Sequence, residues 1–103
     1  MATYDYVIVG AGAAGCVLAN KLTEDPNVTV CLLEAGGGDA HPFIHMPRGC
    51  AKLVRMPSHM YHYMTEPEEG NGQRPDAWLR GKVLGGSTSV NGMVWVRGQP
   101  GDY

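Results

Sequence analysis

The sequence has no basic run and no aromatic residues interleaved with lysines. Its 103 residues carry 8 Lys and Arg against 10 Asp and Glu, which gives a formal net charge of −2. Proteins that bind nucleic acid need a basic surface for the phosphates, so nucleic acid is not an expected partner. The sequence also lacks an apolar run long enough to cross a bilayer, and it does not open with the basic-then-apolar order of a secretory signal. We therefore expect neither a membrane-spanning segment nor secretion by a standard signal.

Cysteine is scarce and forms no C-x-x-C pair. The three cysteines are Cys16, Cys31 and Cys50. Cys16 is expected in a helix and Cys31 in a buried strand, where a small apolar side chain fits well. We interpret all three as reduced packing residues, which favours an intracellular, cytoplasmic setting and leaves association with a membrane open.

Metal-ligand spacing is also missing. The four histidines are His41, His45, His59 and His62. None has a Cys or Asp at the spacing of a zinc site, so no metal is expected. Pro42 and Pro47 argue against a helix that would bring the first two together.

Glycine is abundant, with 15 residues, and its first cluster follows an apolar run. Residues 10–15 read G-A-G-A-A-G directly after the apolar residues 6–9. In this pattern the first glycine permits a tight turn, the second lets the backbone approach a phosphate, and the third lets a helix pack closely on a strand. No Lys or Arg lies between Met1 and Asn20. A pyrophosphate would therefore be held by the free amides that open the helix.

The residues after this turn complete a βαβ pattern. Ala14, Leu18 and Leu22 fall on one helical stripe, and Asp25-Pro26 ends the helix. The apolar run 28–33 predicts a parallel strand that is buried on both faces.

Glu34 ends this second strand, where a carboxylate can bind the hydroxyls of a ribose. A carboxylate at this place repels a 2′-phosphate, which argues against NADP. The alternative is an ordinary βαβ unit with a glutamate on its surface.

A second glycine cluster lies near the end of the sequence. Residues 80–94 read RGKVLGGSTSVNGMV. Paired glycines beside hydroxyl residues suit a loop whose backbone approaches a flat polar ligand or a phosphate. The lysine precedes the glycines, so this is not a P-loop. A plain surface turn is the alternative that the residues alone leave open.

The region between the two clusters shows little periodicity. Residues 36–79 are rich in glycine and proline, and we expect an irregular connection there. A self-sufficient domain rarely contains so long an irregular stretch. We expect the chain to be the opening segment of a larger protein that does not fold stably alone, with a substrate domain outside it.

The sequence closely resembles the glucose–methanol–choline (GMC) family of FAD-dependent oxidoreductases. Three stretches carry the resemblance: residues 4–15, residues 32–36 and residues 80–94. Residues 96–103 continue in the register of bacterial choline and alcohol dehydrogenases. The resemblance implies an α/β fold with a Rossmann-like, FAD-binding βαβ unit that is incomplete without the remaining chain. It divides the sequence into the dinucleotide motif (1–35), the connection (36–79) and a flavin-facing loop (80–103).

The resemblance also assigns residues to the cofactor. Gly10, Gly12, Ala13, Ala14 and Gly15 would cradle the FAD pyrophosphate, while Glu34 with Ala35 would lie at the adenosine ribose. Val83 would touch the cofactor near its adenine half. The loop residues along the flavin ring would be Gly86, Ser87, Asn91, Gly92, Met93 and Val94.

Two family features are absent from these residues. Some family members bind flavin covalently through a histidine in this loop, where this sequence has Val90 beside Asn91, so noncovalent FAD is predicted. The family's general base is a histidine in a C-terminal segment. None of the four histidines here matches it, so no catalytic residue is assigned.

The resemblance implies an enzyme that oxidises an alcohol to an aldehyde or ketone by hydride transfer to flavin N5. Its partners would be a small alcohol, the remaining C-terminal polypeptide, and oxygen or a quinone-like electron acceptor. Two alternatives stay open: a lyase of the cyanohydrin-cleaving kind that keeps FAD as structure, and a dinucleotide-binding module without chemistry.

Overall fold

A parallel two-stranded sheet and one helix form the first arm of the molecule. The computed structural model describes residues 2–102. Strand β1 (Tyr6–Val9) pairs in parallel with β2 (Val30–Leu33), and helix α1 (Ala13–Leu22) connects them. The carboxylate of Asp5 accepts hydrogen bonds from the amide and the hydroxyl of Thr29, which fixes the register where the two strands begin. The expected βαβ unit is present.

Helix α1 packs on the sheet mainly through small residues. Gly15 is buried and Ala19 and Leu22 are half-buried, whereas Ala14 and Leu18 are exposed. Small residues at the first two positions let the helix lie close to the strands. The stripe of Ala14, Leu18 and Leu22 that predicted a helix does lie in one, and its last residue belongs to the packed face.

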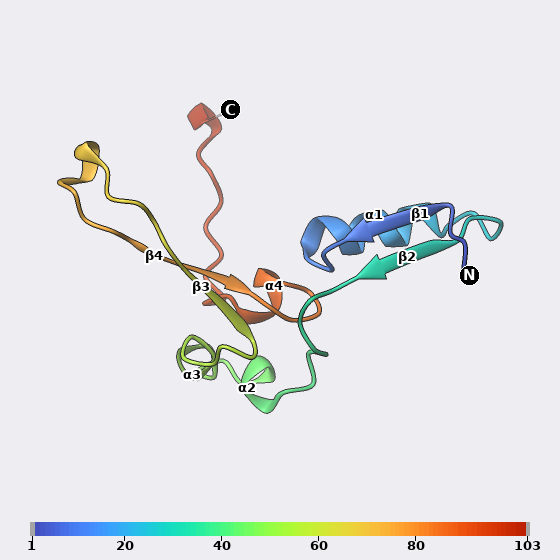
Figure 1. Ribbon diagram of the computed structural model, residues 1–103, viewed down its shortest axis with the longest axis horizontal. Helices are drawn as coiled ribbons and strands as arrows, with labels where there is room; N and C mark the ends of the chain where they lie inside the picture. Colours follow the sequence, from blue (N-terminus) through green and yellow to red (C-terminus); the bar gives the residue numbers. More distant parts are fainter. Residues whose placement is uncertain (1, 103) are drawn as a thin grey trace.

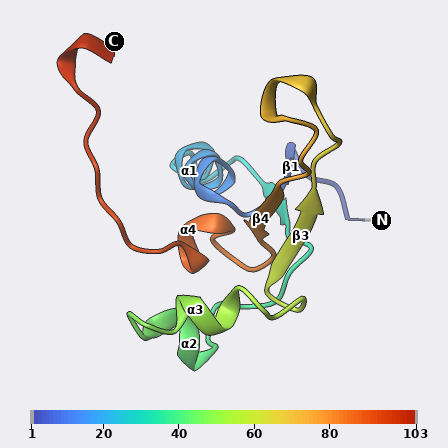
Figure 2. The same ribbon diagram turned by 90° about the vertical axis from the view of Figure 1, so that its left-hand side faces the viewer.

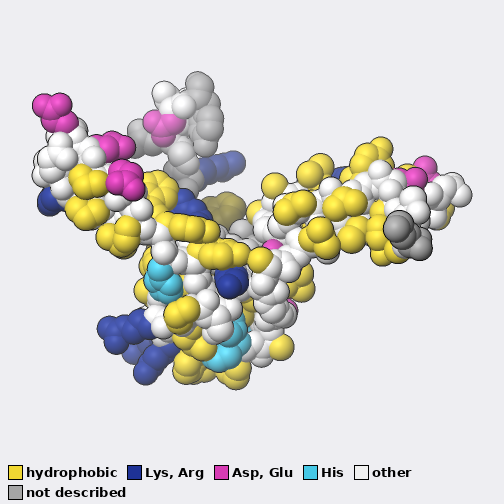
Figure 3. All heavy atoms as spheres, in the orientation of Figure 1, with side chains coloured by type: hydrophobic (Ala, Val, Ile, Leu, Met, Phe, Trp, Pro, Cys, Tyr) yellow, Lys and Arg dark blue, Asp and Glu magenta, His cyan; other side chains and the backbone are white. Residues whose placement is uncertain are grey.

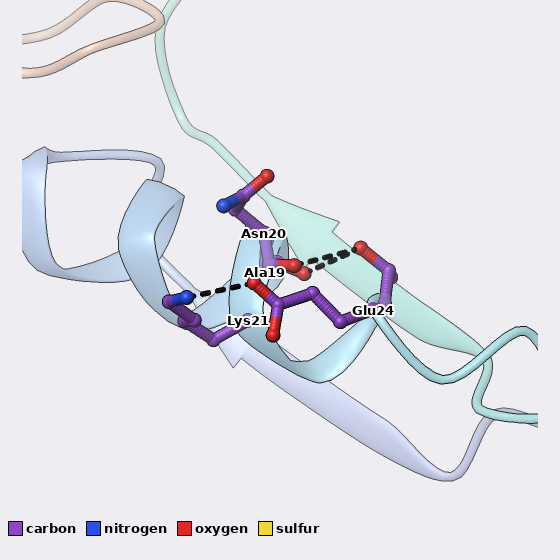
Figure 4. A network of polar contacts seen from close by, with 5 residues as sticks. Ala19, Asn20, Lys21 and Glu24 are labelled. Atoms are coloured by element: carbon purple, nitrogen blue, oxygen red, sulfur yellow. Dashed lines mark hydrogen bonds and ion pairs between the residues drawn. The ribbon is translucent and has the colours of Figure 1, made fainter.

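Polar contacts close the end of α1 (Figure 4). The Lys21 ammonium lies 2.7 Å from a carboxylate oxygen of Glu24, and the Thr23 hydroxyl donates to the carbonyl of Ala19 at 2.8 Å. Thr23 is the C-cap. The helix thus ends just before Asp25-Pro26, as expected.

The second arm is an antiparallel hairpin with short helical turns beneath it (Figure 1). Strand β3 (Met60–Met64) pairs with β4 (Ala77–Gly81), and η1 (Glu69–Asn71) lies in the connection between them. The one-turn helices α2 (Pro42–His45) and α3 (Cys50–Leu53) precede the hairpin. The prediction of an irregular connection over 36–79 is wrong for these segments. Pro42 is tolerated because it occupies the first turn of α2, where its missing N–H leaves no bond unmade.

The core lies under the hairpin. Leu53, Met60, Val83 and Val90 form a buried cluster, and Phe43, Ile44, Met56 and Leu79 pack against it. Helix α4 (Ser87–Val90) closes this cluster. The chain then runs outward to η2 (Pro100–Asp102), away from the rest of the structure in both ribbon views (Figures 1 and 2).

The two arms leave a large apolar surface open. The radius of gyration is 17.2 Å, compared with about 13 Å for a compact chain of this size. Val9 is 84% exposed and Trp95 is 92% exposed. Apolar side chains cover much of the first arm in the space-filling view (Figure 3). Strand β2, which was expected to be buried on both faces, is half-buried over Val30–Leu32 and exposed at Leu33 within the described residues, contrary to that expectation.

Candidate functional site

An open cleft of about 640 Å³ separates the two arms. One wall is made by the carboxyl ends of β1 and β2 with the turn before α1. The opposite wall is made by the hairpin and the loop after β4. The residues that line it are Val9, Gly10, Gly12, Leu33, Glu34, Ala35, Tyr61, Tyr63, Arg80, Gly81, Gly86 and Ser87. The cleft thus brings together residues from both glycine clusters.

The first glycine turn has the conformation that its spacing predicts. Gly10 has φ of +98°, a region that residues with a side chain rarely adopt. Its amide donates to the carbonyl of Leu33 at 2.7 Å, which ties the turn to the end of β2. A Cβ on Gly15 would overlap the carbonyl oxygen of Gly10. Glycine is therefore required at both positions by the backbone conformation and the packing of the turn.

Gly12 has a different reason to be glycine. A Cβ at this position would meet no protein atom within 4 Å, so it would point into the open cleft. Gly12 is also the N-cap of α1, and no side chain caps the helix or places a carboxylate in its first turn. The helix amides with their partial positive charge therefore stay available to an anion. A dinucleotide diphosphate fits this cradle.

Glu34 fixes the geometry of the cleft floor. One carboxylate oxygen accepts from the amide of Ala11 and the other from the amide of Gly36, each at 2.8 Å. The amide of Gly36, followed by that of Ala11, lowers the pKa of Glu34. Each oxygen keeps a lone pair for a hydroxyl, so Glu34 can hold the turn and bind a ribose at the same time.

The second glycine cluster docks directly on the first. The amide of Gly85 donates to the carbonyl of Ala11 at 2.7 Å, and Ala11 is fully buried. Gly86 has φ of +58°, and a Cβ on it would lie 3.0 Å from the Cα of Gly12. The plain surface turn that the residues left open is therefore excluded for this part of the cluster.

The hairpin wall was not foreseen from the sequence. Tyr61 pairs with Arg80 and Tyr63 with Trp78, so all four side chains lie on one face of the hairpin. The two tyrosine rings stack with centroids 5.5 Å apart. The signal that could have shown this wall is a weak period-2 alternation in residues 60–64 and 77–81; on the other face of the hairpin, Met60 and Leu79 reach the core.

Several predicted cofactor residues lie outside the cleft lining. Ala13, Ala14 and Gly15 are in α1, beside the turn. Val83 is fully buried in the core and does not reach the cleft with its side chain. Asn91, Gly92, Met93 and Val94 follow α4. The assignment of Asn91 to Val94 to the flavin ring stays a prediction, and Tyr103 lies outside the described residues.

The histidines and cysteines form no reactive centre in the part of the chain that the structure describes. No group of three metal-ligating side chains occurs among residues 2–102. His41 and His59 are neighbours, with ring centroids 4.8 Å apart, but Nδ1 of His41 accepts from the Phe43 amide as a helix cap. All three cysteines are free thiols. None of the described helices is long and apolar enough to span a membrane.

Comparison with known proteins gives a consistent match over nearly the whole chain. The GMC oxidoreductase family model matches residues 4–103. An alcohol dehydrogenase [acceptor] from Pseudomonas putida is 53% identical over 97% of this chain. An oxygen-dependent choline dehydrogenase from Photobacterium profundum is 48% identical over 98% of it.

Solved structures show the same relationship. The crystal structure of pyridoxine 4-oxidase from Mesorbium loti superposes with a TM-score of 0.85 and 40% identity over 97% of this chain. A structure of formate oxidase from Aspergillus oryzae RIB40, concerned with FAD modification, has a TM-score of 0.82 and 38% identity over 95%. The chain spans 18% of the length of each curated relative and 19% and 18% of these two structures.

Proposed function

The chain belongs to the GMC oxidoreductase family, and from this membership we propose that it is the FAD-binding N-terminal region of an enzyme that oxidises an alcohol to an aldehyde or ketone. The observation that carries the proposal is the contact of the two glycine clusters around one cleft. Gly12 and Gly86 abut there, and a Cβ on Gly12 would meet no protein atom within 4 Å. A βαβ unit with a surface glutamate would not need the second cluster.

The residues of the chain would bind and orient the cofactor. The α1 amides beside Gly12 would bind the diphosphate, and Glu34 would accept hydrogen bonds from the hydroxyls of the adenosine ribose. When bound, FAD supplies the two-electron acceptor for the oxidation. Ser87 stands at the rim of the cleft, where its hydroxyl accepts from the Gly81 amide at 3.0 Å and so fixes the loop that leads toward Asn91.

None of the four histidines lines the cleft, so the group that removes the proton of the alcohol is proposed to lie outside the described residues. His45 and His62 each bond a backbone carbonyl through Nε2, and His41 caps α2, so these histidines have structural partners. The general base would come from the remaining C-terminal polypeptide. Oxygen or a quinone-like compound would reoxidise the cofactor, and a cytoplasmic location stays a prediction.

The named relatives support oxidation rather than cleavage. They are dehydrogenases and oxidases, and none of those described above is a lyase. A protein that only binds a dinucleotide, without chemistry, would not require the loop after Gly86.

The test is anaerobic titration of the full-length protein with a panel of primary alcohols, including choline. Bleaching of the flavin absorbance band by at least one alcohol is the expected result. A protein that binds FAD but stays fully oxidised with every alcohol would contradict the proposed reaction. A protein that binds NAD and not FAD would contradict the proposed cofactor.

FAD is proposed to bind noncovalently. Val90 is 7% exposed and packs in the core with Leu53 and Val83, and an aliphatic side chain cannot form a bond to the flavin. Acid precipitation of the full-length protein should therefore release the yellow flavin into the supernatant. Flavin that stays on the precipitated polypeptide would contradict this proposal.

A further inference from the structure

The first glycine cluster has no basic side chain near it in the sequence, but the fold supplies one. Arg80 belongs to β4 and is the cationic residue among those that line the cleft. The lining also contains one carboxylate, Glu34, which is ionised at neutral pH as an ordinary glutamate is. The formal charges of these two side chains balance. A bound diphosphate would leave the cleft negative and would be drawn to the cation.

The end of β4, where Arg80 lies, is connected to the turn before α1 by a short chain of contacts. Its neighbour Gly81 donates an amide hydrogen bond to the Ser87 hydroxyl at 3.0 Å. Ser87 follows Gly86, which abuts Gly12. The end of β4 and the turn before α1 are thus tied together across the cleft.

The guanidinium of Arg80 is oriented by its own strand. It lies 4.8 Å from the centroid of the Trp78 ring, and Nη1 donates to the carbonyl of Leu79 at 2.8 Å. These contacts hold the planar group without a carboxylate partner. An arginine that is positioned but not ion-paired keeps its remaining donors for an anion, and guanidinium matches phosphate oxygens in a two-pronged arrangement.

We infer that Arg80 is a diphosphate-binding residue, and that it supplies from the hairpin the positive charge that the first glycine turn lacks. The inference rests on the proposed function, since it assumes that a dinucleotide occupies the cleft. It assigns to the hairpin a role in binding the cofactor as well as in forming the far wall.

The experiment measures the affinities of the full-length apoprotein for FAD, ADP and adenosine by calorimetry. Arg80→Gln should weaken ADP binding by about tenfold to a hundredfold, the range for a lost hydrogen bond to a charged group, while adenosine affinity changes less than twofold. Arg80→Lys keeps a point charge and should fall between the wild type and Arg80→Gln. Added salt should weaken ADP binding less in Arg80→Gln than in the wild type.

Arg74→Gln is the matched control. Arg74 lies in the connection between β3 and β4, is exposed, and also bonds a backbone carbonyl, that of Asn71, but it does not line the cleft. It should bind ADP like the wild type. The inference would be overturned if Arg80→Gln and Arg74→Gln had the same ADP affinity, or if Arg80→Gln lost as much affinity for adenosine as for ADP. In either case, FAD binding by the wild type would still uphold the proposed function. A wild-type apoprotein that binds neither FAD nor ADP would overturn both.

Discussion

The carbonyl of Ala11 accepts a 2.7 Å hydrogen bond from the amide of Gly85, which joins the two glycine turns of the chain. Ala11 also donates its own amide to Glu34 at 2.8 Å. One buried residue, Ala11, thus connects the end of β2, the turn before α1 and the loop before α4. A substitution at any of these three places should therefore alter the backbone geometry at the other two.

Gly86→Ala should separate the two glycine turns. The new Cβ would lie 3.0 Å from the Cα of Gly12, and the residue would keep φ of +58°. Such a backbone conformation is strained by about 1–3 kcal/mol for a residue with a side chain. We expect a loss of stability of this order and weaker FAD binding, measured by thermal unfolding and by flavin fluorescence of the full-length protein. Gly70→Ala, with open space around the Cβ, is the control and should behave like the wild type.

Gly12→Ala and Gly15→Ala should affect different properties: Gly12→Ala the affinity for FAD, and Gly15→Ala the stability of the apoprotein. The Cβ on Gly15 would overlap the Gly10 carbonyl, whereas the Cβ on Gly12 would enter the cleft. Gly15→Ala should lower the stability of the apoprotein by about 1–3 kcal/mol, as for an overpacked site. Gly12→Ala should leave that stability nearly unchanged and weaken FAD binding at least tenfold. Apoprotein melting curves and FAD titrations separate the two effects, and equal apoprotein stabilities would contradict this prediction.

The sequence predicted the first arm better than the second. The strand 6–9, the turn after it and Glu34 follow from local rules on periodicity and on glycine spacing. The hairpin of β3 and β4 was missed because its alternation, Met60-Tyr61-His62-Tyr63, mixes polar and apolar residues on both faces. The inner face of the hairpin is identified by tertiary contacts: Met60 and Leu79 pack with Leu53 and Val83 in the core.

The binding cleft could be predicted only in part for the same reason. Gly10, Gly12 and Glu34 belong to a local motif, and the family resemblance added Gly86 and Ser87. Arg80 reaches the cleft through strand pairing with Tyr61 and through the bond between Gly81 and Ser87. Both contacts depend on how the hairpin and the following loop fold. A spacing rule on the residues around Arg80 therefore could not predict that Arg80 lines the cleft.

Glu34→Gln should change how stability depends on pH. The amides of Gly36 and Ala11 lower the pKa of Glu34 below the ordinary value of about 4.3. A lowered pKa means that the carboxylate stabilises the fold above that value, and that this stabilisation is lost as the pH falls through the pKa of the folded state. The melting temperature of the full-length protein should therefore fall less on acidification in Glu34→Gln than in the wild type, and the variant should be the less stable one at neutral pH.

Asp5→Asn is the matched control for Glu34→Gln. Hydrogen bonds from the hydroxyl and then the amide of Thr29 lower the pKa of Asp5, so its replacement should also reduce the loss of stability in acid. Asp5 lies at the start of β1, away from the cleft, and its variant should keep the wild-type affinity for FAD. A wild-type affinity in Glu34→Gln as well would show that Glu34 does not contact the cofactor.

The isolated chain of 103 residues should not unfold cooperatively. Among the described residues, the core is one cluster of four buried hydrophobic residues, while Val9, Val94, Trp95 and Val96 are each more than 80% exposed. A two-stranded sheet without cover is at best marginal in water, because too little apolar area is removed from solvent to offset the ordering of the backbone. We expect a broad, non-cooperative melting curve by circular dichroism and strong binding of a hydrophobic dye. The full-length protein should show neither property. A sharp thermal transition of the isolated chain as a monomer, verified by light scattering, would show instead that the two arms stabilise each other through the contact between Ala11 and Gly85.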